Sequence, residues 1–350
     1  MARLSGGDDA ALQTIVDTVV EGGRLEAAQA RTAVEAIMDG RLPPARLAAL
    51  LVALRTRGET VVEITEFARV MRERCTPVRC AAGVVLDTCG TGGDGAGTFN
   101  ISTLAALVVA AAGVVVAKHG NRSVSSRCGS ADLLQGLGIQ VDAPVETVER
   151  CLREVGIGFL FAPSLHGAMR HAAPVRRELG GRTVFNILGP LTNPAGARHQ
   201  LLGVYDPGRL EVMAEVLREL GSERAMVVHG GGLDEITLHG TTRIAELENG
   251  RVRVSEVTPE DAGLERAGLG ELAGGDVAHN VGIARRILSG ERGPRRDVVL
   301  LNAAAALVVA GVAADLKAGV RRAAEAIDSG SAGQVLARLR ALCPADGAVP

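Results

Sequence analysis

Apolar residues recur every three or four positions throughout the first 75 residues of the chain, which is the pattern of amphipathic helices. Glycines interrupt this pattern, so that three separate helices are predicted within residues 9–22, 25–40 and 43–59. A fourth helix is predicted from Thr60 to Arg74. We therefore expect residues 1–75 to form a small, all-helical domain.

The hydrophobic pattern then changes to short apolar runs that are typical of buried strands. Strands are predicted at 83–89, 114–118, 159–162, 201–205 and 225–230. Helical patterns lie between and after them, for example at 208–221 and 301–330, and a glycine-rich stretch around 262–275 is predicted to be a surface turn. Strands that alternate with helices indicate an open sheet. The predicted fold class is α/β, in which a small all-helical N-terminal domain precedes a larger α/β domain with a mostly parallel central sheet.

Composition narrows the class of protein. The 350 residues are 47% hydrophobic, which is enough to bury a sizeable core in two domains. The net charge is −2, tryptophan is absent and tyrosine occurs once, so neither a general attraction to nucleic acid nor base stacking is expected. The longest apolar run, 104–117, is too short to cross a bilayer. No nucleic-acid or membrane partner is predicted.

The cysteines and the first residues bear on the cellular compartment. The six cysteines include no CxxC pair, and in a chain of this length they are typical of free thiols in a reducing compartment. The first residues carry acids and have no apolar core, which is not the pattern of a signal peptide. We expect a cytoplasmic protein.

Residues 87–103, DTCGTGGDGAGTFNIST, place closely spaced glycines after a predicted strand and short polar side chains before a predicted helix. Residues 90–95 satisfy GxGxxG, but no acid follows at the distance that a dinucleotide site requires, and the P-loop pattern GxxxxGK[ST] is absent. A tight turn with an ordinary helix cap explains one glycine and one serine. The remaining glycines and hydroxyls favour a phosphate site.

The next predicted strand ends in a second polar loop, KHGNRSVSSRCGS, at 118–130. Its cations and serines suit an anion with many oxygen atoms, although a solvated basic loop is the simpler alternative. Neighbouring strands would bring both loops to one cleft. His119 could serve as the base of a nucleophile, but no GxSxG elbow accompanies it, so a positioning or structural role is preferred.

Two adjacent carboxylates, Asp234 and Glu235, follow a predicted strand and a glycine turn in GGGLDEIT, at 230–237. Most such pairs are surface acids. Mg²⁺, however, binds through one or two carboxylates together with substrate phosphates, and two candidate phosphate loops need a counter-ion. The sequence therefore predicts a Mg²⁺ site.

Four long motifs occur in one order, and together they closely resemble the anthranilate phosphoribosyltransferase family: GTGGDG…TFNIST, KHGNRSVSS…GSAD, VRRELGGRTVFNILGPLTNP and GGGLDEIT. The resemblance runs from about residue 10 to about residue 340. It implies a helical domain, 1–75, joined by a hinge to an α/β domain at 82–160 and 186–345. A segment near 165–185 would return to the helical side, and the helical part would form a homodimer.

The family joins anthranilate to 5-phosphoribosyl 1-pyrophosphate, which gives N-(5-phosphoribosyl)anthranilate and pyrophosphate in L-tryptophan biosynthesis. The resemblance implies that Mg²⁺ is held at Ser102, Asp234 and Glu235. Anthranilate would contact Gly90, Asn121 and Arg176, and no general base is predicted. Phosphoribosyl pyrophosphate would contact Gly90, Gly93, Asp94, Thr98, Asn100, Ile101, Ser102, Thr103, Lys118, His119, Gly120, Asn121, Arg122, Ser123, Val124, Ser125, Ser126 and Ser130.

Two alternatives stay open at this point. A pyrimidine nucleoside phosphorylase would share the architecture, but its glycine loop carries a lysine-led pattern that DTCGTGGDG lacks. A nucleic-acid-binding relative without the enzymatic activity would be expected to carry a basic surface. Two positions depart from the family pattern, namely Gly167, where proline is common, and Cys128, where serine is common.

Overall fold

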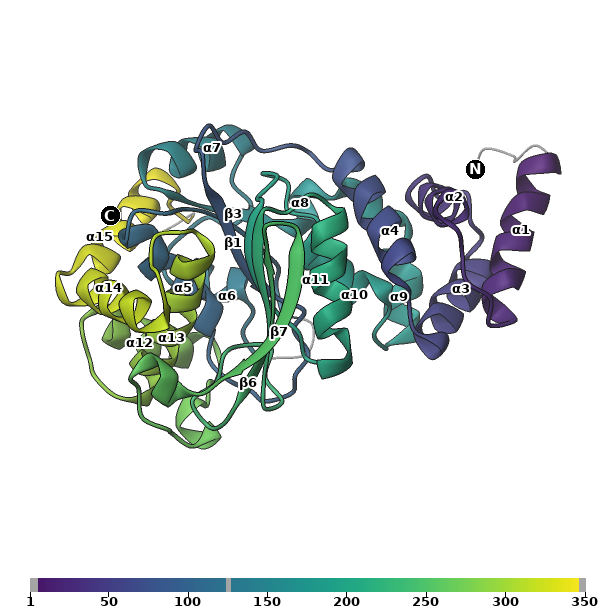
Figure 1. Ribbon diagram of the computed structural model, residues 1–350. Coiled ribbons are helices and arrows are strands. Elements are labelled where there is room, and N and C mark those ends of the chain that lie inside the picture. Colours follow the sequence, from purple (N-terminus) through teal and green to yellow (C-terminus); the bar gives the residue numbers. More distant parts are fainter. Residues whose placement is uncertain (1–5, 124–126, 346–350) are drawn as a thin grey trace.

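The computed structural model describes residues 6–123 and 127–345, and its N-terminal part is helical. The helix α4 begins with a reciprocal cap, because the Thr60 side chain accepts from the Glu63 amide and the Glu63 carboxylate accepts from the Thr60 amide. Figure 1 shows that α1, α2 and α3 project from one end of the molecule. The four predicted helices are confirmed as α1 (Gly6–Val20), α2 (Ala27–Met38), α3 (Pro44–Arg57) and α4 (Val61–Arg74).

Seven strands form one sheet in the order β3-β2-β1-β4-β5-β6-β7. The first five strands run parallel to one another, and each lies within two residues of its predicted bounds. The mostly parallel sheet is therefore confirmed. The bounds are β1 (Val85–Gly90), β2 (Val115–Gly120), β3 (Ile157–Phe161), β4 (His199–Gly203), β5 (Arg224–Gly230), β6 (Thr242–Glu248) and β7 (Arg251–Val257).

The sequence reasoning missed the antiparallel strands β6 and β7 at one edge of the sheet. They form a hairpin around Asn249 and Gly250, whose φ angles of 52° and 72° suit a tight two-residue turn. An Asn-Gly pair between alternating residues was the available signal. The predicted helix at 301–330 is also two helices, because the chain turns at Gly311 and restarts at the N-cap Asp315.

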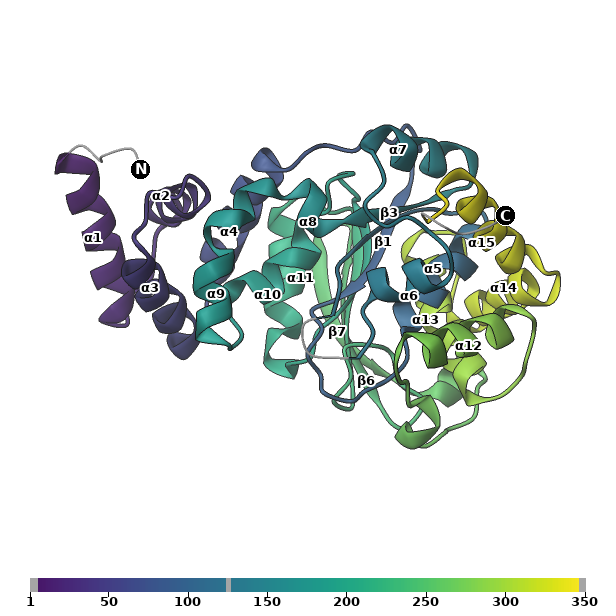
Figure 2. The same ribbon diagram turned by 180° about the vertical axis from the view of Figure 1, so that it is seen from behind.

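Helices cover both faces of the sheet (Figures 1 and 2). On one face, α5 and α13 bury an almost wholly apolar core against the strands. On the other face, α10 and α11 pack with the N-terminal helices, so that α4 and the sheet share one core. The remaining helices are α5 (Ile101–Ala111), α6 (Ser130–Gly136), α7 (Val145–Glu154), α8 (Ala162–Leu165), α9 (Ala173–Leu179), α10 (Val184–Leu188), α11 (Leu210–Glu219), α12 (Val277–Leu288), α13 (Pro294–Val309), α14 (Leu316–Asp328) and α15 (Ser331–Leu342).

The strand order reverses at β1, which lies between β2 and β4. The connections from β1 and β4 therefore leave in opposite directions, and in open α/β sheets the carboxyl ends of such strands flank the ligand-binding crevice, the name used here for this region. Gly90 ends β1, Gly120 ends β2 and Gly203 ends β4. Both predicted phosphate loops begin at this edge of the sheet.

Candidate functional site

The glycine loop after β1 is tied to the loop that carries the predicted metal ligands. The Gly92 amide donates to Asp234 Oδ2 at 2.7 Å, although the two residues are 142 positions apart. The Thr91 amide donates to the Gly203 carbonyl at 2.9 Å. The loop is thus attached to two neighbouring strand ends.

Two glycines are required by the close approach of Asp234. A Cβ on Gly90 would lie 2.3 Å from Asp234 Oδ2, and one on Gly203 would lie 1.6 Å from the Asp234 carbonyl oxygen. Both distances are far below any real contact, so a larger residue at Gly90 would displace the Asp234 carboxylate and one at Gly203 would displace the Asp234 backbone. Gly90 was predicted as a ligand contact; the structure gives its lack of a side chain a further, steric reason.

The helix α5 begins at the same crevice. The Ser102 amide, in the first turn, donates to Glu235 Oε1 at 3.1 Å. Asn100 precedes the helix but does not cap it; its side chain donates to the Cys128 carbonyl at 2.9 Å and accepts from Asn280 at 3.1 Å. The Thr103 hydroxyl is buried without a hydrogen-bond partner among the described residues, and Ile101 is buried in the core. The N-terminus of α5 presents partial positive charge to the crevice.

Lys118 brings a buried cation to this helix start. Its Nζ donates to the Thr88 carbonyl at 2.5 Å and lies 3.5 Å from Ser102 Oγ. Burial lowers the pKa of Lys118, while the carboxylates of Asp87 and Glu235 oppose that shift. The described residues place no carboxylate within ion-pair distance of this ammonium group, which lies between β1 and the first turn of α5.

His119 is buried and held within the protein interior. Its backbone amide donates to Asp87 Oδ1 at 3.1 Å, and its Nδ1 lies 3.0 Å from the Gly189 carbonyl, which only accepts. Its ring lies 5.1 Å from that of His166. Burial, the neighbouring His166 and, last, Lys118 lower the pKa of His119 to about 3, so the imidazole is neutral near pH 7. This geometry favours the structural role.

The rest of the second loop lies at the surface of the crevice. Asn121 and Arg122 are exposed, and Arg122 pairs with Asp132 at 2.9 Å. The Ser130 hydroxyl donates to the Asn121 carbonyl at 3.2 Å, and a Cβ on Gly120 would lie 2.4 Å from that hydroxyl. Ser123 is half-buried. The predicted contacts Val124, Ser125 and Ser126 lie outside the described residues.

Asp234 and Glu235 form a pair of half-buried carboxylates. Removal from water raises the pKa of both groups, and repulsion adds to it, from Asp94 for Asp234 and from Asp234 for Glu235. No cluster of three or more His, Cys, Asp or Glu side chains able to hold a metal ion occurs within residues 6–123 and 127–345. The two carboxylates are therefore an electrostatically strained pair that a cation would relieve.

The far half of the glycine loop is held by the stretch predicted as a surface turn. Thr98 pairs with Ala273 in an isolated bridge, the Phe99 amide donates to the Leu272 carbonyl at 3.2 Å, and the Gly274 amide donates to the Gly97 carbonyl at 2.8 Å. The surface-turn prediction is thus wrong for 272–274, which packs against the glycine loop. Nothing in the local sequence signals that long-range pairing.

Two arginines on the segment near α9 differ in their surroundings. Arg176 is half-buried, its guanidinium carbon lies 5.2 Å from the Phe185 ring centroid, and burial lowers its pKa. The described residues contain no carboxylate partner for Arg176 and no contact that joins it to Gly90 or Asn121. Arg182, which the sequence reasoning did not single out, donates to the Gly93 carbonyl of the glycine loop.

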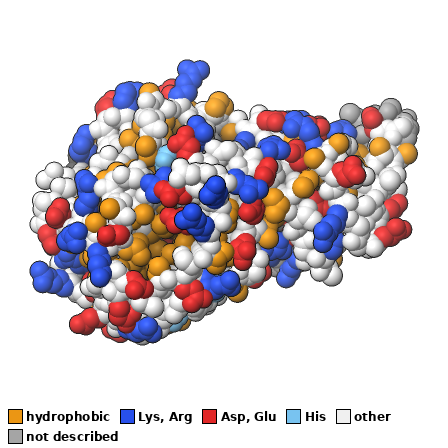
Figure 3. Space-filling view, in the orientation of Figure 1, with side chains coloured by type: hydrophobic (Ala, Val, Ile, Leu, Met, Phe, Trp, Pro, Cys, Tyr) orange, Lys and Arg blue, Asp and Glu red, His pale blue; other side chains and the backbone are white. Residues whose placement is uncertain are grey.

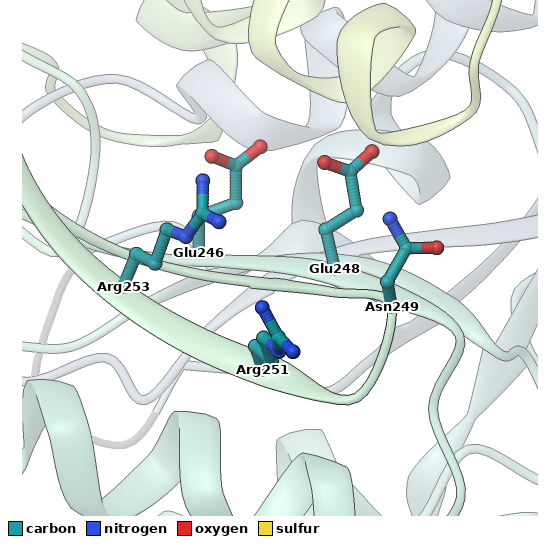
Figure 4. A pocket seen from close by; sticks show the side chains of 5 residues that line it. All are labelled: Glu246, Glu248, Asn249, Arg251 and Arg253. Carbon is teal, nitrogen blue, oxygen red and sulfur yellow. The ribbon is translucent and has the colours of Figure 1, made fainter.

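Two hollows lie outside this crevice. One, of about 350 Å³, lies between α3 and residues 179–183, and Arg55 and Arg182 line it. The other, of about 230 Å³, is lined by charged residues of the β6–β7 hairpin, whose side chains are seen in Figure 4. Because Glu248 pairs with Arg224 at the start of β5, this second hollow lies at the opposite edge of the sheet from Gly90.

On the face of the molecule shown in Figure 3, Lys and Arg side chains are interspersed with Asp and Glu side chains. Within the described residues, no helix combines the length and the apolar character that a membrane crossing requires.

Two family models match the chain. A model described as the helical bundle domain of a glycosyl transferase family matches residues 13–75, and one described as the a/b domain of a glycosyl transferase family matches residues 82–333. An anthranilate phosphoribosyltransferase of Moorella thermoacetica is 59% identical over 322 residues, which cover 92% of this chain and 95% of the relative.

Solved structures share the whole architecture. The anthranilate phosphoribosyltransferase of Thermus thermophilus superposes with a TM-score of 0.89 at 51% identity and covers 94% of this chain and 98% of its own. The Saccharomyces cerevisiae enzyme, in complex with phosphoribosyl pyrophosphate and Mg, has a TM-score of 0.87 at 28% identity. The match covers 95% of this chain and 98% of the yeast chain. The same yeast enzyme has also been solved in complex with 4-fluoroanthranilate.

Proposed function

The chain belongs to the anthranilate phosphoribosyltransferase family, and we propose how its own residues carry out the family's reaction. The enzyme transfers the phosphoribosyl group of 5-phosphoribosyl 1-pyrophosphate to the amine of anthranilate and releases pyrophosphate, in L-tryptophan biosynthesis. One observation supports the proposal most directly. The glycine loop, the start of α5 and the Asp234–Glu235 pair meet at the carboxyl end of β1 through the contacts of Gly92 and Ser102.

Phosphoribosyl pyrophosphate is assigned to the crevice between the two loops. Its phosphates would accept from amides of the glycine loop and from the first turn of α5, where the helix dipole favours an anion. Asn100 supports this arrangement, because its side chain ties the helix start to the second loop through Cys128. The proposed contacts are Gly90, Gly93, Asp94, Thr98, Asn100 to Thr103, Lys118 to Ser126 and Ser130.

The residues at Asp234 and Glu235 fit Mg²⁺. Two half-buried carboxylates repel each other beside the hydroxyl-bearing Ser102, and hard oxygen donors of this kind are what Mg²⁺ prefers. When bound, Mg²⁺ supplies positive charge that offsets the charge of the pyrophosphate. Glu235 and Asp234 would hold it from one side, and Ser102 Oγ is the third proposed ligand.

Anthranilate is assigned to the side of the crevice that faces α9. Arg176 supports this assignment, because a half-buried guanidinium without a carboxylate partner in the described residues suits the carboxylate of anthranilate. Gly90 and Asn121 are the other proposed contacts. The guanidinium of Arg176 is planar and lies over the ring of Phe185, and its fork suits both oxygens of a carboxylate.

The chemistry asks the protein mainly for electrostatic stabilisation. The bond between the anomeric carbon of ribose and the pyrophosphate oxygen breaks, the amine nitrogen of anthranilate bonds to that carbon and then releases one proton to solvent, and negative charge grows on the departing pyrophosphate. Lys118 and the N-terminus of α5 would stabilise that charge. The amine of anthranilate carries a lone pair near neutral pH, so no general base is assigned, and His119 is held in the protein by Gly189.

Loss of anthranilate fluorescence on addition of phosphoribosyl pyrophosphate and Mg²⁺ tests this function. We expect turnover that stops when the metal is chelated. Turnover of thymidine with inorganic phosphate, without any turnover of anthranilate, would support the nucleoside phosphorylase alternative instead. A DNA mobility shift that falls with salt would support the nucleic-acid-binding alternative.

The assembly, the location and the division into domains are also proposals. A homodimer through the helical part is supported by Val20 on α1 and Val52 on α3, which are large apolar side chains exposed at 56% and 49%. A cytoplasmic location is supported by the six cysteines, all of which are free thiols. We propose a helical domain made of residues 1–75 and a returning segment near 165–185. The α/β domain consists of residues 82–160 and 186–345.

A further inference from the structure

Three consecutive residues of the glycine loop are each held by a different part of the chain. Thr91 is held by the end of β4, and its hydroxyl also accepts from the Tyr205 amide at 3.2 Å. Gly92 is held by Asp234. Gly93 is held by Arg182, which comes from the four-residue linker between α9 and α10. The first two contacts lie within the α/β part, and the third comes from the segment that joins the helical side (Figure 2).

Arg182 is clamped between a ring and a peptide group. Its guanidinium carbon lies 3.7 Å from the centroid of the Tyr205 ring, which is the distance of a stacked cation–π pair. A Cβ on Gly93 would lie 2.9 Å from the Arg182 Nη2 atom, so the glycine permits this approach. The described residues contain no carboxylate within ion-pair distance of Arg182. The polar partner of its guanidinium is therefore a backbone carbonyl of the glycine loop.

Because the peptide group is planar, the contact of Arg182 with the Gly93 carbonyl also fixes the direction of the Asp94 N–H. In a trans peptide, the Gly93 carbonyl and the Asp94 amide point to opposite sides. Because Arg182 binds the oxygen, the Asp94 N–H is directed away from Arg182, and the described residues give that N–H no hydrogen-bond acceptor. A donor fixed in this way at a phosphate loop is preorganised for an anion.

We propose that Arg182 is a positioning residue that fixes the Gly93–Asp94 peptide so that the Asp94 amide binds phosphoribosyl pyrophosphate. The Tyr205 ring, on which the guanidinium stacks, holds Arg182 in this orientation. This inference rests on the proposed function, because it takes its ligand from there. It adds a residue outside both loops to the phosphate site. It also favours arginine, since a lysine ammonium can lie over the ring but lacks the planar fork that stacks on the ring and donates to the carbonyl at the same time.

Steady-state kinetics of Arg182→Ala test the proposal. We expect KM for phosphoribosyl pyrophosphate to rise about tenfold to hundredfold, which is the loss expected for the charge-assisted hydrogen bond from the Asp94 amide to a phosphate. KM for anthranilate should change less than about threefold. Arg182→Lys should recover only a minor part of the loss. Arg170→Ala is the matched control, because Arg170 is exposed on the same segment, and it should leave both KM values unchanged.

The chain itself supplies a second readout. Tyr205 is the single tyrosine and tryptophan is absent, so the intrinsic emission comes from the ring under Arg182. Titration with phosphoribosyl pyrophosphate and Mg²⁺, without anthranilate, should change this emission in the wild type. In Arg182→Ala, the half-maximal change should require about tenfold to hundredfold more ligand.

The outcomes separate the two proposals. Active wild type with normal KM for phosphoribosyl pyrophosphate in Arg182→Ala overturns the role of Arg182 and leaves the enzyme's function standing. Equal losses for both substrates, together with a lower melting temperature, mean that Arg182 is merely structural and also overturn it. If the wild type does not consume anthranilate, the proposed function fails, and the emission titration alone then decides the inference; an unresponsive Tyr205 contradicts it.

Discussion

Glu235 accepts a hydrogen bond from the backbone amide of Ser102 at 3.1 Å, across 133 positions of sequence. Glu235→Gln keeps an oxygen that can accept from this amide but removes one ligand charge. We therefore expect the Mg²⁺ concentration for half-maximal activity to rise at least about tenfold, with a lower kcat. A Mg²⁺ titration of the anthranilate fluorescence assay measures this.

Glu246→Gln is the control for that change, because Glu246 lies on β6 at the other edge of the sheet. It should leave the Mg²⁺ titration unchanged. If Glu235→Gln also leaves it unchanged, Glu235 is not a metal ligand.

Gly90→Ala should damage the site by steric displacement. Its new Cβ would lie 2.3 Å from Asp234 Oδ2, so the carboxylate must move away from its position. Strain of about 1–3 kcal/mol corresponds to roughly a fivefold to hundredfold loss of kcat/KM for phosphoribosyl pyrophosphate. Gly83→Ala introduces the same methyl group into open space and should have no effect. Equal activity of the two variants would contradict the steric argument.

Arg176→Ala should separate the two substrates. The loss of a charge-assisted contact of roughly 1.5–3 kcal/mol raises KM for anthranilate about tenfold to hundredfold and leaves KM for phosphoribosyl pyrophosphate nearly unchanged. Arg177→Ala is the control, because Arg177 is the exposed neighbour on the same helix. A larger effect of Arg177→Ala would mean that the anthranilate pocket lies elsewhere.

Two neighbouring buried histidines, His119 and His166, predict an acid-sensitive fold. Burial lowers the pKa of His119 to about 3 and that of His166 to about 4, against an ordinary value of 6.5. A depressed pKa in the folded state means that the stability contributed above pH 6.5 is lost as the pH falls toward those values. Two charged groups lie beside His119: Asp87, which accepts from the His119 backbone amide, and Lys118, which contributes to the lowered pKa of His119.

His119→Asn, whose side-chain amide can still donate to Gly189, removes one of these titrations. Its melting temperature should fall less than that of the wild type between about pH 6.5 and pH 4. Calorimetry at several pH values measures the difference. Parallel curves for the two proteins would show that His119 does not titrate in this range.

The proposed dimer predicts a response to charge on the exposed face of α3. Val52→Glu places a charge in the proposed apolar contact and should shift the protein toward monomer, with at least about a tenfold weaker dimer. Val254→Glu on β7 is the control, since Val254 is exposed at 44% and Val52 at 49%. Analytical ultracentrifugation measures the shift. A wild type that is monomeric would remove the dimer proposal.

The sequence alone predicted the elements that have local signals. A buried strand, a glycine turn or a helix cap such as Thr60 depends on residues that are close together in the chain, so its pattern can be read from the sequence. The two strand-end loops could be placed together because parallel strands share an edge. Arg182 was missed, because its role depends on Tyr205 and Gly93, which are distant in sequence and meet only after folding. The pairing of Thr98 with Ala273 was missed for the same reason.

The burial of Lys118 has a consequence for chemical modification. The chain contains only two lysines, Lys118 and Lys317, and Lys317 is exposed on α14. An amine-directed acylating reagent therefore meets one lysine at the surface and one that is 3% exposed between Thr88 and Ser102. Acylation of Lys118 requires a fluctuation that exposes its Nζ. Its rate, measured by mass spectrometry against Lys317 as an internal reference, reports how often that exposure occurs.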